Sequence, residues 1–218
     1  MFVAGYKLFD ENRTVTVENN MLATMKIDMP EGSTIWLSEG SSITYKPKTY
    51  KEKRRVQLIG EADLEIMPNR LHPFVLNGPA ISITVLGTVF SVRDYPGEPT
   101  SETTLAEGAI VMKVKHTNNT LNVGVGQKAV YDHLTKDVKV ESVNTDRLSL
   151  RRFGIISIES ASIDEILSKL KQNYGKNLLI TKLPLDSSAK YTFNYPEEAR
   201  LEDVISLLER ITGSKIDI

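Results

Sequence analysis

The segment that comes nearest to a known chemical motif is residues 124–129, with the sequence GVGQKA. Its glycine spacing matches the fingerprint with which dinucleotide-binding proteins hold a pyrophosphate. That fingerprint needs a helix that begins at its last position and points its N-terminal amides at the phosphates. Here alternating hydrophobic and polar residues follow instead, from 129 to 132. We therefore interpret the segment as a turn between two strands.

The three histidines, His72, His116 and His133, are far apart in the sequence. A metal site built on neighbouring strands needs several such ligands at short, fixed intervals. Each histidine is instead flanked by turn residues or charged residues. We therefore expect solvated turn histidines and no metal site.

Carboxylates are the remaining groups that could catalyse a reaction. Glu61, Asp63 and Glu65 alternate along one expected strand, and we expect Asp63 and Glu65 to face outward, opposite Leu64 and Ile66. Glycoside hydrolysis needs two carboxyl groups that face each other across a cleft, and the sequence identifies no facing partner. Cysteine, the nucleophile-elbow serine motif and the phosphate-binding loop are all absent from the sequence. We assign no catalytic, cofactor-binding or metal-binding residue and expect no enzyme.

Residues 45–55 form the one strongly basic segment, in which Tyr45 and Tyr50 alternate with cations and Glu52 is the single acid. Its cations are Lys46, Lys48, Lys51, Lys53, Arg54 and Arg55. Aromatic and cationic side chains together could bind single-stranded nucleic acid, and the cations alone could bind an acidic protein. A solvated loop, or an edge strand that lysines protect from aggregation, is the commoner explanation.

The composition excludes several classes of protein. The chain has 218 residues, with 27 basic and 28 acidic side chains and a net charge of −1. This balance gives no support to a nucleic-acid binder. The N-terminus lacks the pattern of a signal peptide, and no run of 18 apolar residues could span a membrane.

Two patterns of hydrophobicity divide the chain. From about residue 15 to residue 143, β-branched and apolar residues alternate with polar ones in short runs separated by turns. This period of two is typical of half-buried strands. We therefore predict an all-β domain over residues 1–148, arranged as a sandwich, a barrel or a twisted solenoid.

After Arg151 the apolar period changes to that of an amphipathic helix. Ser162 and Glu165 form a capping-box pattern, and Gly175 marks the end of that helix. An offset of 38 residues relates this segment to a second one that ends at Gly213, and each helix lies between two expected strands. Residues 149–218 are therefore predicted to form a duplicated β-α-β domain, which makes the whole chain α+β.

Three aromatic residues, Tyr191, Phe193 and Tyr195, alternate along one strand of this duplication. They share one face of the strand, which is usually a core face. A surface that docks a partner is the alternative interpretation.

Several motifs of the β region together resemble those of FecR-family anti-sigma factors. In order, they are the segments 30–38, 41–45, 55–62, 72–76, 85–92, 105–108 and 126–127. The C-terminal part resembles the short domain found at the N-terminus of secretins and TonB-dependent transporters, as in Bacteroidetes-type members of the family. Departures such as Glu31 for aspartate and Val125 for proline fall at turn or packing positions. Gly32, Gly60, Gly87 and Gly108 are interpreted as fold-defining.

The resemblance implies a periplasmic sensor that acts through protein–protein contact and needs no cofactor. Its expected partners are the signalling domain of a TonB-dependent outer-membrane transporter and an extracytoplasmic-function sigma factor. Family members reach the sigma factor through a cytoplasmic segment and one membrane span, and the sequence contains neither. We therefore expect the ectodomain of a single-pass inner-membrane protein, with no role in nucleic-acid binding. A secreted carbohydrate-binding or adhesion module is the alternative.

Overall fold

The computed structural model describes residues 14–21, 24–115, 117, 119–151, 153–182 and 188–218. Within these residues the chain forms two compact units. The first unit extends along the chain to Val143, and the second consists mainly of Asn144–Ile218. None of the described helices has the length and hydrophobicity needed to cross a membrane.

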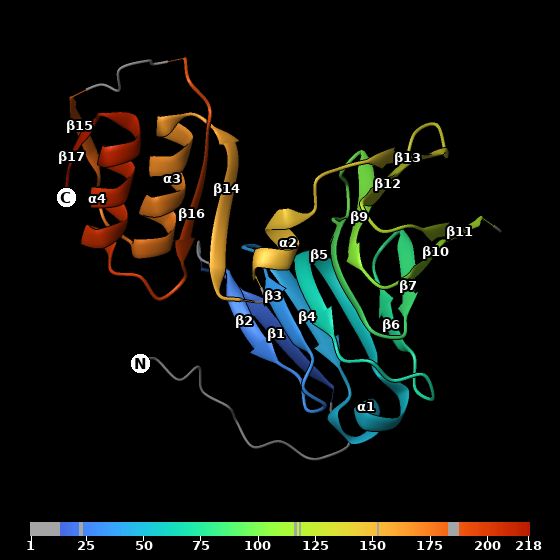
Figure 1. Cartoon of the computed structure of the whole chain (residues 1–218). Helices are drawn as coiled ribbons and strands as arrows, with labels where there is room; N and C mark the ends of the chain where they lie inside the picture. The colour runs from blue at the N-terminus through green and yellow to red at the C-terminus, as the bar shows by residue number, and fades with distance from the viewer. Residues whose placement is uncertain (1–13, 22–23, 116, 118, 152, 183–187) are drawn as a thin grey trace. The chain divides into compact units, whose positions relative to one another are not determined.

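The first unit is mostly β (Figure 1). Its elements are β1 (Val15–Asn19), β2 (Met25–Asp28), β3 (Thr34–Leu37), β4 (Ser41–Tyr45), α1 (Pro47–Lys53), β5 (Arg55–Ile66), β6 (Phe74–Asn77), β7 (Ile81–Val85), β8 (Thr88–Asp94), β9 (Thr100–Glu107), β10 (Ile110–Val114), β11 (Thr120–Val123), β12 (Gln127–Asp132) and β13 (Val138–Ser142).

These strands form one large mixed sheet, nearly closed like a barrel, in two halves that share β5. One half has the order β1-β4-β5-β6-β7-β10-β11, and the other has the order β2-β3-β5-β8-β9-β12-β13. All neighbours are antiparallel except β5 and β6. Side chains from both halves bury one common core, which includes Ile43, Leu58, Leu64 and Phe90. The predicted β character of this region is confirmed.

Strand β5 passes from one half of the sheet to the other at Gly60. Its first half pairs with β4 and β6, and its second half pairs with β3 and β8. Gly60 has φ +113°, and a Cβ atom there would lie 2.6 Å from the Cβ of Ser41. The Ser41 hydroxyl accepts a hydrogen bond of 2.9 Å from the amide of Glu61. Glycine is thus required at this point by its backbone conformation and by the close approach of Ser41.

The helix α1 corrects the sequence analysis, which expected a loop or an edge strand over residues 45–55. Pro47 begins the helix, where its missing N–H costs no hydrogen bond. The helix ends at Arg54, which has the left-handed φ of +40°. At seven residues the helix is too short for a hydrophobic period to reveal it in the sequence.

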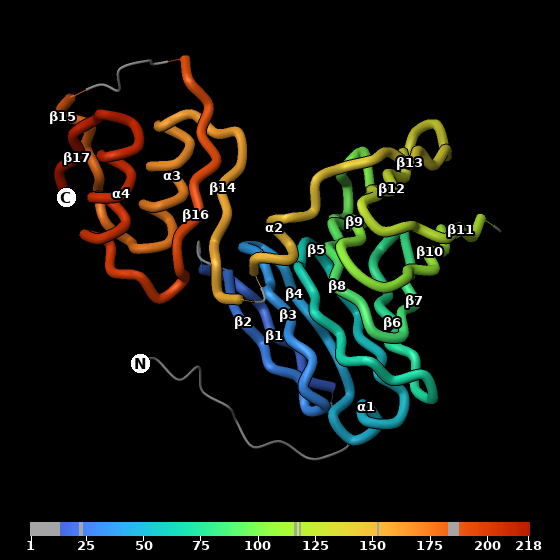
Figure 2. Tube along the Cα trace, viewed as in Figure 1, coloured from blue at the N-terminus to red at the C-terminus, as the bar shows by residue number. Residues whose placement is uncertain are grey.

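The second unit contains α2 (Asp146–Arg151) and two β-α-β segments (Figure 2). The first segment consists of β14 (Ile155–Ala161), α3 (Ile163–Tyr174) and β15 (Leu179–Lys182). The second segment consists of β16 (Tyr191–Pro196), α4 (Leu201–Thr212) and β17 (Lys215–Asp217). Equivalent strands pair antiparallel, β14 with β16 and β15 with β17, and the two helices lie between the resulting sheets. The prediction of helices together with strands in this part is confirmed.

Buried aromatic residues of β16 contribute to the core of this unit. Phe193 and Tyr195 are buried, and their ring centroids lie 5.6 Å apart. Burial raises the pKa of Tyr195 to about 12, and Asn173 donates a hydrogen bond of 2.7 Å to its hydroxyl. Tyr191 is partly buried and packs against the same core. The aromatic alternation of this strand therefore faces the core.

The start of α3 is fixed by the capping box expected from the sequence. The amide of Ser162 donates a hydrogen bond of 2.6 Å to Oε2 of Glu165, and the amide of Glu165 donates one of 3.3 Å to Oγ of Ser162. Lys190 also lies 3.0 Å from the same carboxylate oxygen. These contacts lower the pKa of Glu165 to about 2, chiefly through the Ser162 amide.

We predict that Gly60→Ala destabilises the first unit by about 2–5 kcal/mol, because a positive φ and a clash with Ser41 act together. Gly97→Ala is the matched control, since Gly97 has φ +86° and no atom within 4 Å of the added Cβ. It should cost only about 1–2 kcal/mol of backbone strain. Urea unfolding followed by the fluorescence of Trp36, the single tryptophan, measures both costs. Equal costs would contradict the role given to Ser41.

We also predict that Glu165→Gln destabilises the second unit at neutral pH. A carboxylate whose folded pKa is depressed contributes stability above its unfolded pKa of about 4.3, and that contribution is lost as pH falls towards the folded value. Urea unfolding followed by circular dichroism at 222 nm should therefore show a clear difference between the variant and the parent at pH 7. The difference should become much smaller at pH 3, and a constant difference would exclude the ionised capping box as its source.

Candidate functional site

The acidic residues singled out in β5 do not face each other across a cleft. Glu61 is paired with Arg93 at 2.7 Å, and Arg93 also contacts Glu98 at 2.5 Å. Asp63, expected to face solvent, is buried with 7% of its surface exposed. It lies in register with Trp36 on β3, and the large indole beside it explains the error. These positions resemble a structural ion-pair network more than a catalytic pair.

The histidines are dispersed, and His116 lies outside the described residues. The Nδ1 atom of His72 lies 2.8 Å from the carbonyl oxygen of Glu52. The Nε2 atom of His133 lies 2.7 Å from Oγ of Ser101, which donates a hydrogen bond of 2.7 Å to buried Asp94. His133 lies in a turn, as expected, and is half-buried. Among the described residues, no group of three or more histidine and acidic side chains could hold a metal ion.

The segment 124–129 is the expected turn between β11 and β12, and β12 begins at Gln127. The Gln127 side chain closes the turn by accepting a hydrogen bond of 2.8 Å from the amide of Gly124. The chain continues as a strand, so no helix N-terminus is available for a pyrophosphate.

The strongest polar cluster of the first unit surrounds the buried guanidinium of Arg54. Arg54 has 1% of its surface exposed. Its Nη2 donates a hydrogen bond of 2.7 Å to the carbonyl of Met67, and its Nη1 donates one of 3.0 Å to the carbonyl of His72. These two carbonyls lie near the two ends of the connection between β5 and β6. One side chain therefore fastens the connection that makes β6 parallel to β5.

The turn before β3 completes this cluster through Glu31 and Ser33. Arg54 lies 3.4 Å from Oε1 of Glu31, which also accepts hydrogen bonds from Tyr50 at 2.9 Å and from Ser33 at 2.8 Å. Ser33 in turn accepts a hydrogen bond of 3.0 Å from the amide of Met67. Burial, together with the negative charge of Glu31, raises the pKa of Tyr50 far above its usual range. The cluster is thus a largely buried network with a structural role, in which Oε2 of Glu31 and Nε of Arg54 have no hydrogen-bond partner among the described residues.

Sequence reasoning missed this network because its members come from three separate segments: the turn before β3, α1 with its C-cap, and the connection between β5 and β6. It treated Arg54 as one of six surface cations, although five of them are exposed and Arg54 is not. Two features of the sequence could have indicated the network. Glu31 and Ser33 lie together in one turn, and Arg54 lies directly before a strand of alternating pattern.

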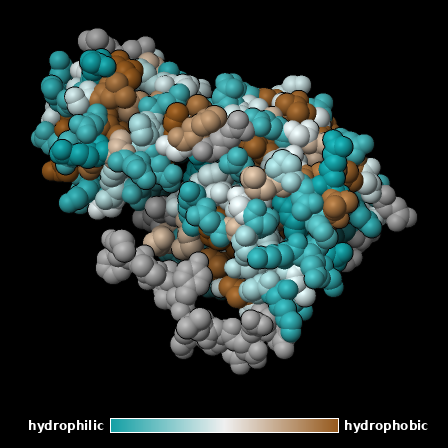
Figure 3. All heavy atoms as spheres, turned by 60° about the horizontal axis from the view of Figure 1, so that its bottom comes forward, coloured by the Kyte–Doolittle hydropathy of each residue, from teal (hydrophilic) through white to brown (hydrophobic). Residues whose placement is uncertain are grey.

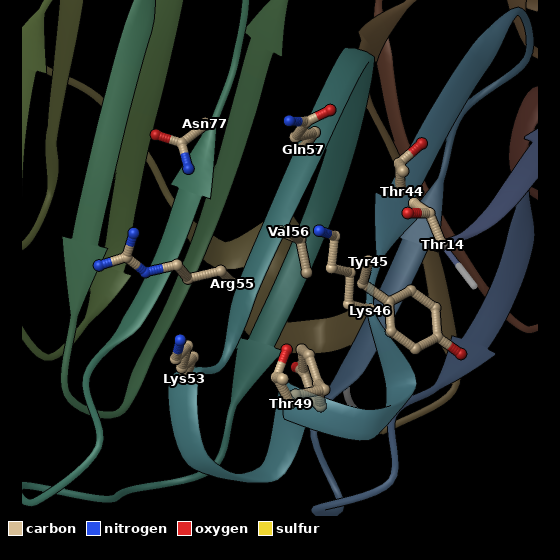
Figure 4. A pocket seen from close by; sticks show the side chains of 11 residues that line it. Thr14, Thr44, Tyr45, Lys46, Thr49, Lys53, Arg55, Val56, Gln57 and Asn77 are labelled. Atoms are coloured by element: carbon tan, nitrogen blue, oxygen red, sulfur yellow. The ribbon is translucent and has the colours of Figure 1, made fainter. Parts of the chain in front are cut away.

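A cavity with a volume of about 480 Å³ lies beside α1, between this helix and the strands β4, β5 and β6 (Figure 4). Lys46, Lys53 and Arg55 line it together with Gln57 and Asn77. Among the described residues, no acidic side chain lines the cavity. Three cations of the basic segment are therefore brought to one concave site.

The large, nearly closed sheet and its buried network define a β-rich protein. Residues 15–111 match the family model described as FecR protein. The resemblance found in the sequence is thereby confirmed, and this segment of the chain belongs to the FecR family.

Of the four family-motif glycines, Gly32, Gly60 and Gly108 have positive φ. They serve the fold, as expected.

Two crystal structures of a candidate anti-sigma factor from Parabacteroides distasonis ATCC 8503 are similar to this chain. Their TM-scores are 0.59 and 0.60 at 16% sequence identity. The alignments cover 91% and 92% of this chain and 92% of that protein's chain. At this identity the likeness establishes a shared fold. A search of curated proteins finds no match.

We predict that Arg54→Met destabilises the first unit by about 3–5 kcal/mol, because it leaves Glu31 and two backbone carbonyls without their cationic partner. Arg55→Met is the matched control, since its exposed side chain should contribute less than about 0.5 kcal/mol. Urea unfolding followed by Trp36 fluorescence compares the two variants. Similar losses for both would contradict the importance assigned to burial of the guanidinium.

Proposed function

We propose that this chain is the periplasmic, sensing portion of a transmembrane regulator of an extracytoplasmic-function sigma factor. It relays a signal from a TonB-dependent outer-membrane transporter by protein–protein contact. The membrane span and the sigma-binding segment of such a regulator belong to parts of the protein outside these residues. The observation that carries the proposal is the FecR match over residues 15–111.

Two further observations support this proposal. The likeness to a candidate anti-sigma factor extends through the second unit, because it covers 91% of the chain. The family-motif residues Glu31, Ser33, Ser41 and Gly60 support the fold of the first unit, and no group of metal-binding side chains is present among the described residues. A protein that acts by contact needs only complementary surfaces, whereas an enzyme needs assembled reactive groups.

We place the contact with the transporter's signalling domain on the second unit, at the sheet of β15 and β17. This sheet has two strands, so both of its edges are unpaired among the described residues. An unpaired edge offers backbone groups to a strand of a partner. Leu179 of β15 and Ile218, next to β17, expose 67% and 60% of their surfaces there.

The position of Leu179 and Ile218 distinguishes them from other exposed apolar side chains. On the face of the molecule shown in Figure 3, hydrophobic residues lie in small groups among hydrophilic ones. Isolated exposed leucines of that kind are ordinary. Leu179 differs because it lies on a short sheet with free edges, where a partner strand would bury it. Burial of a leucine contributes about 1.5–3 kcal/mol to binding.

We predict that the purified chain binds the signalling domain of its cognate transporter in isothermal titration calorimetry, with a Kd below tens of micromolar. Leu179→Asp should weaken this binding at least tenfold, because it places a charge in an apolar contact. Leu71→Asp is the matched control, since Leu71 exposes 86% of its surface in the first unit. It should leave the affinity unchanged.

The results of this experiment test the proposed contact surface and the proposed relay function independently. Binding that resists Leu179→Asp would relocate the contact and leave the sensor function in place. No binding to the signalling domain of any transporter encoded beside this chain would contradict the relay itself.

A further inference from the structure

We propose that the cavity beside α1, here called the basic pocket, binds a small solute that carries several carboxylate or phosphate groups. The basic pocket lies on the outer side of β4, β5 and β6, within the first unit. Its volume of about 480 Å³ lies within the range of about 300–1,000 Å³ that small-molecule sites occupy. The proposal is independent of the contact with the transporter, which involves the second unit.

The basic pocket carries positive charge that no described acidic side chain balances. Lys46, Lys53 and Arg55 line the basic pocket, and the structure gives none of them an acidic partner among the described residues. Some other cations of this chain do have acidic partners, as Lys128 has Glu102 at 2.7 Å and Lys190 has Glu165 at 3.0 Å. Three cations around one concavity repel one another unless an anion lies between them. The missing negative charge is therefore expected from a ligand.

The helix dipole does not explain this arrangement. Lys53 is in the last turn of α1, where a cation is favourable. Lys46 is at the N-cap of the same helix, whose first turn contains no acidic residue. A cation at that end is unfavourable, so helix stability alone would not select Lys46.

Neutral donors complete the basic pocket. Thr44, Gln57 and Asn77 lie in register on the neighbouring strands β4, β5 and β6, so their side chains form a row across the sheet. Ser82 donates a hydrogen bond of 3.1 Å to Oδ1 of Asn77, which leaves the Asn77 amide group free to donate. Figure 4 shows Asn77 and Gln57 toward one end and Lys53 and Thr49 toward the other, with Arg55 between Asn77 and Lys53. Such donors bind the oxygen atoms of an anion.

The backbone that carries the cations is firmly held. Lys53 and Arg55 flank Arg54, whose side chain is fixed by the buried network. Tyr45 and Tyr50 pack edge to face, with ring centroids 5.4 Å apart, on the other side of the pocket. A preorganised site loses less conformational entropy when it binds a ligand.

The test uses pyrophosphate and tricarballylate as the two probes, one with phosphate and one with carboxylate groups. Each is titrated into the intact chain by calorimetry at low ionic strength, and the site is located by NMR chemical-shift changes. We expect one-to-one binding of at least one probe, with shifts centred on residues 44–57 and Asn77. The preferred probe identifies the ligand group.

The variant Lys53→Gln/Arg55→Gln should weaken binding at least tenfold. The control Lys51→Gln/Lys139→Gln removes the same charge from exposed positions that do not line the basic pocket, and it should change the affinity less than twofold. Both double variants should keep the parent's urea midpoint by Trp36 fluorescence. Equal weakening by the two variants would show unspecific attraction and overturn the proposal. So would the absence of binding by both probes at about 5 mM, several times a weak Kd of about 1 mM.

Discussion

The hydrogen bonds from Arg54 to the carbonyls of Met67 and His72 stabilise the first unit where β5 bends and the chain continues into β6. A straight strand of 12 residues is about 40 Å long, yet one arginine at the start of β5 reaches Met67, just beyond its end. β5 therefore has to bend sharply, and Gly60 permits it. Both halves of the sheet, and the core between them, depend on this bend.

Several residues of the family motifs stabilise this bend of β5. Glu31 and Ser33 complete the network of Arg54, while Ser41 and Gly60 shape the bend of β5. Residues used in this way are buried or half-buried and make most of their hydrogen bonds to one another and to the backbone, so they have a structural role. We propose that recognition instead uses two surfaces outside this network, the basic pocket beside α1 and the short sheet of β15 and β17.

Local patterns predicted the elements that depend on local physics. The alternation of residues 81–85 predicted β7, because one face of a strand must be buried. Ser162, Glu165 and Gly175 predicted both ends of α3, since caps satisfy backbone groups only a few residues away. Helix α1 and the burial of Asp63 were missed, because a seven-residue helix shows no period and a cross-strand neighbour is invisible in the sequence.

The sequence by itself determined the β character of the first unit, the presence of helices with strands in the second and the family resemblance of residues 15–111, because each is encoded in periods and spacings along the chain. Only the tertiary structure decided which of six neighbouring cations is buried and which three line the basic pocket. Arg54 and Arg55 are adjacent and chemically identical, and they differ because Arg54 takes a left-handed conformation that turns it inward, while Arg55 begins a strand and faces solvent. That difference arises from the path of the chain around β5, and not from residue type.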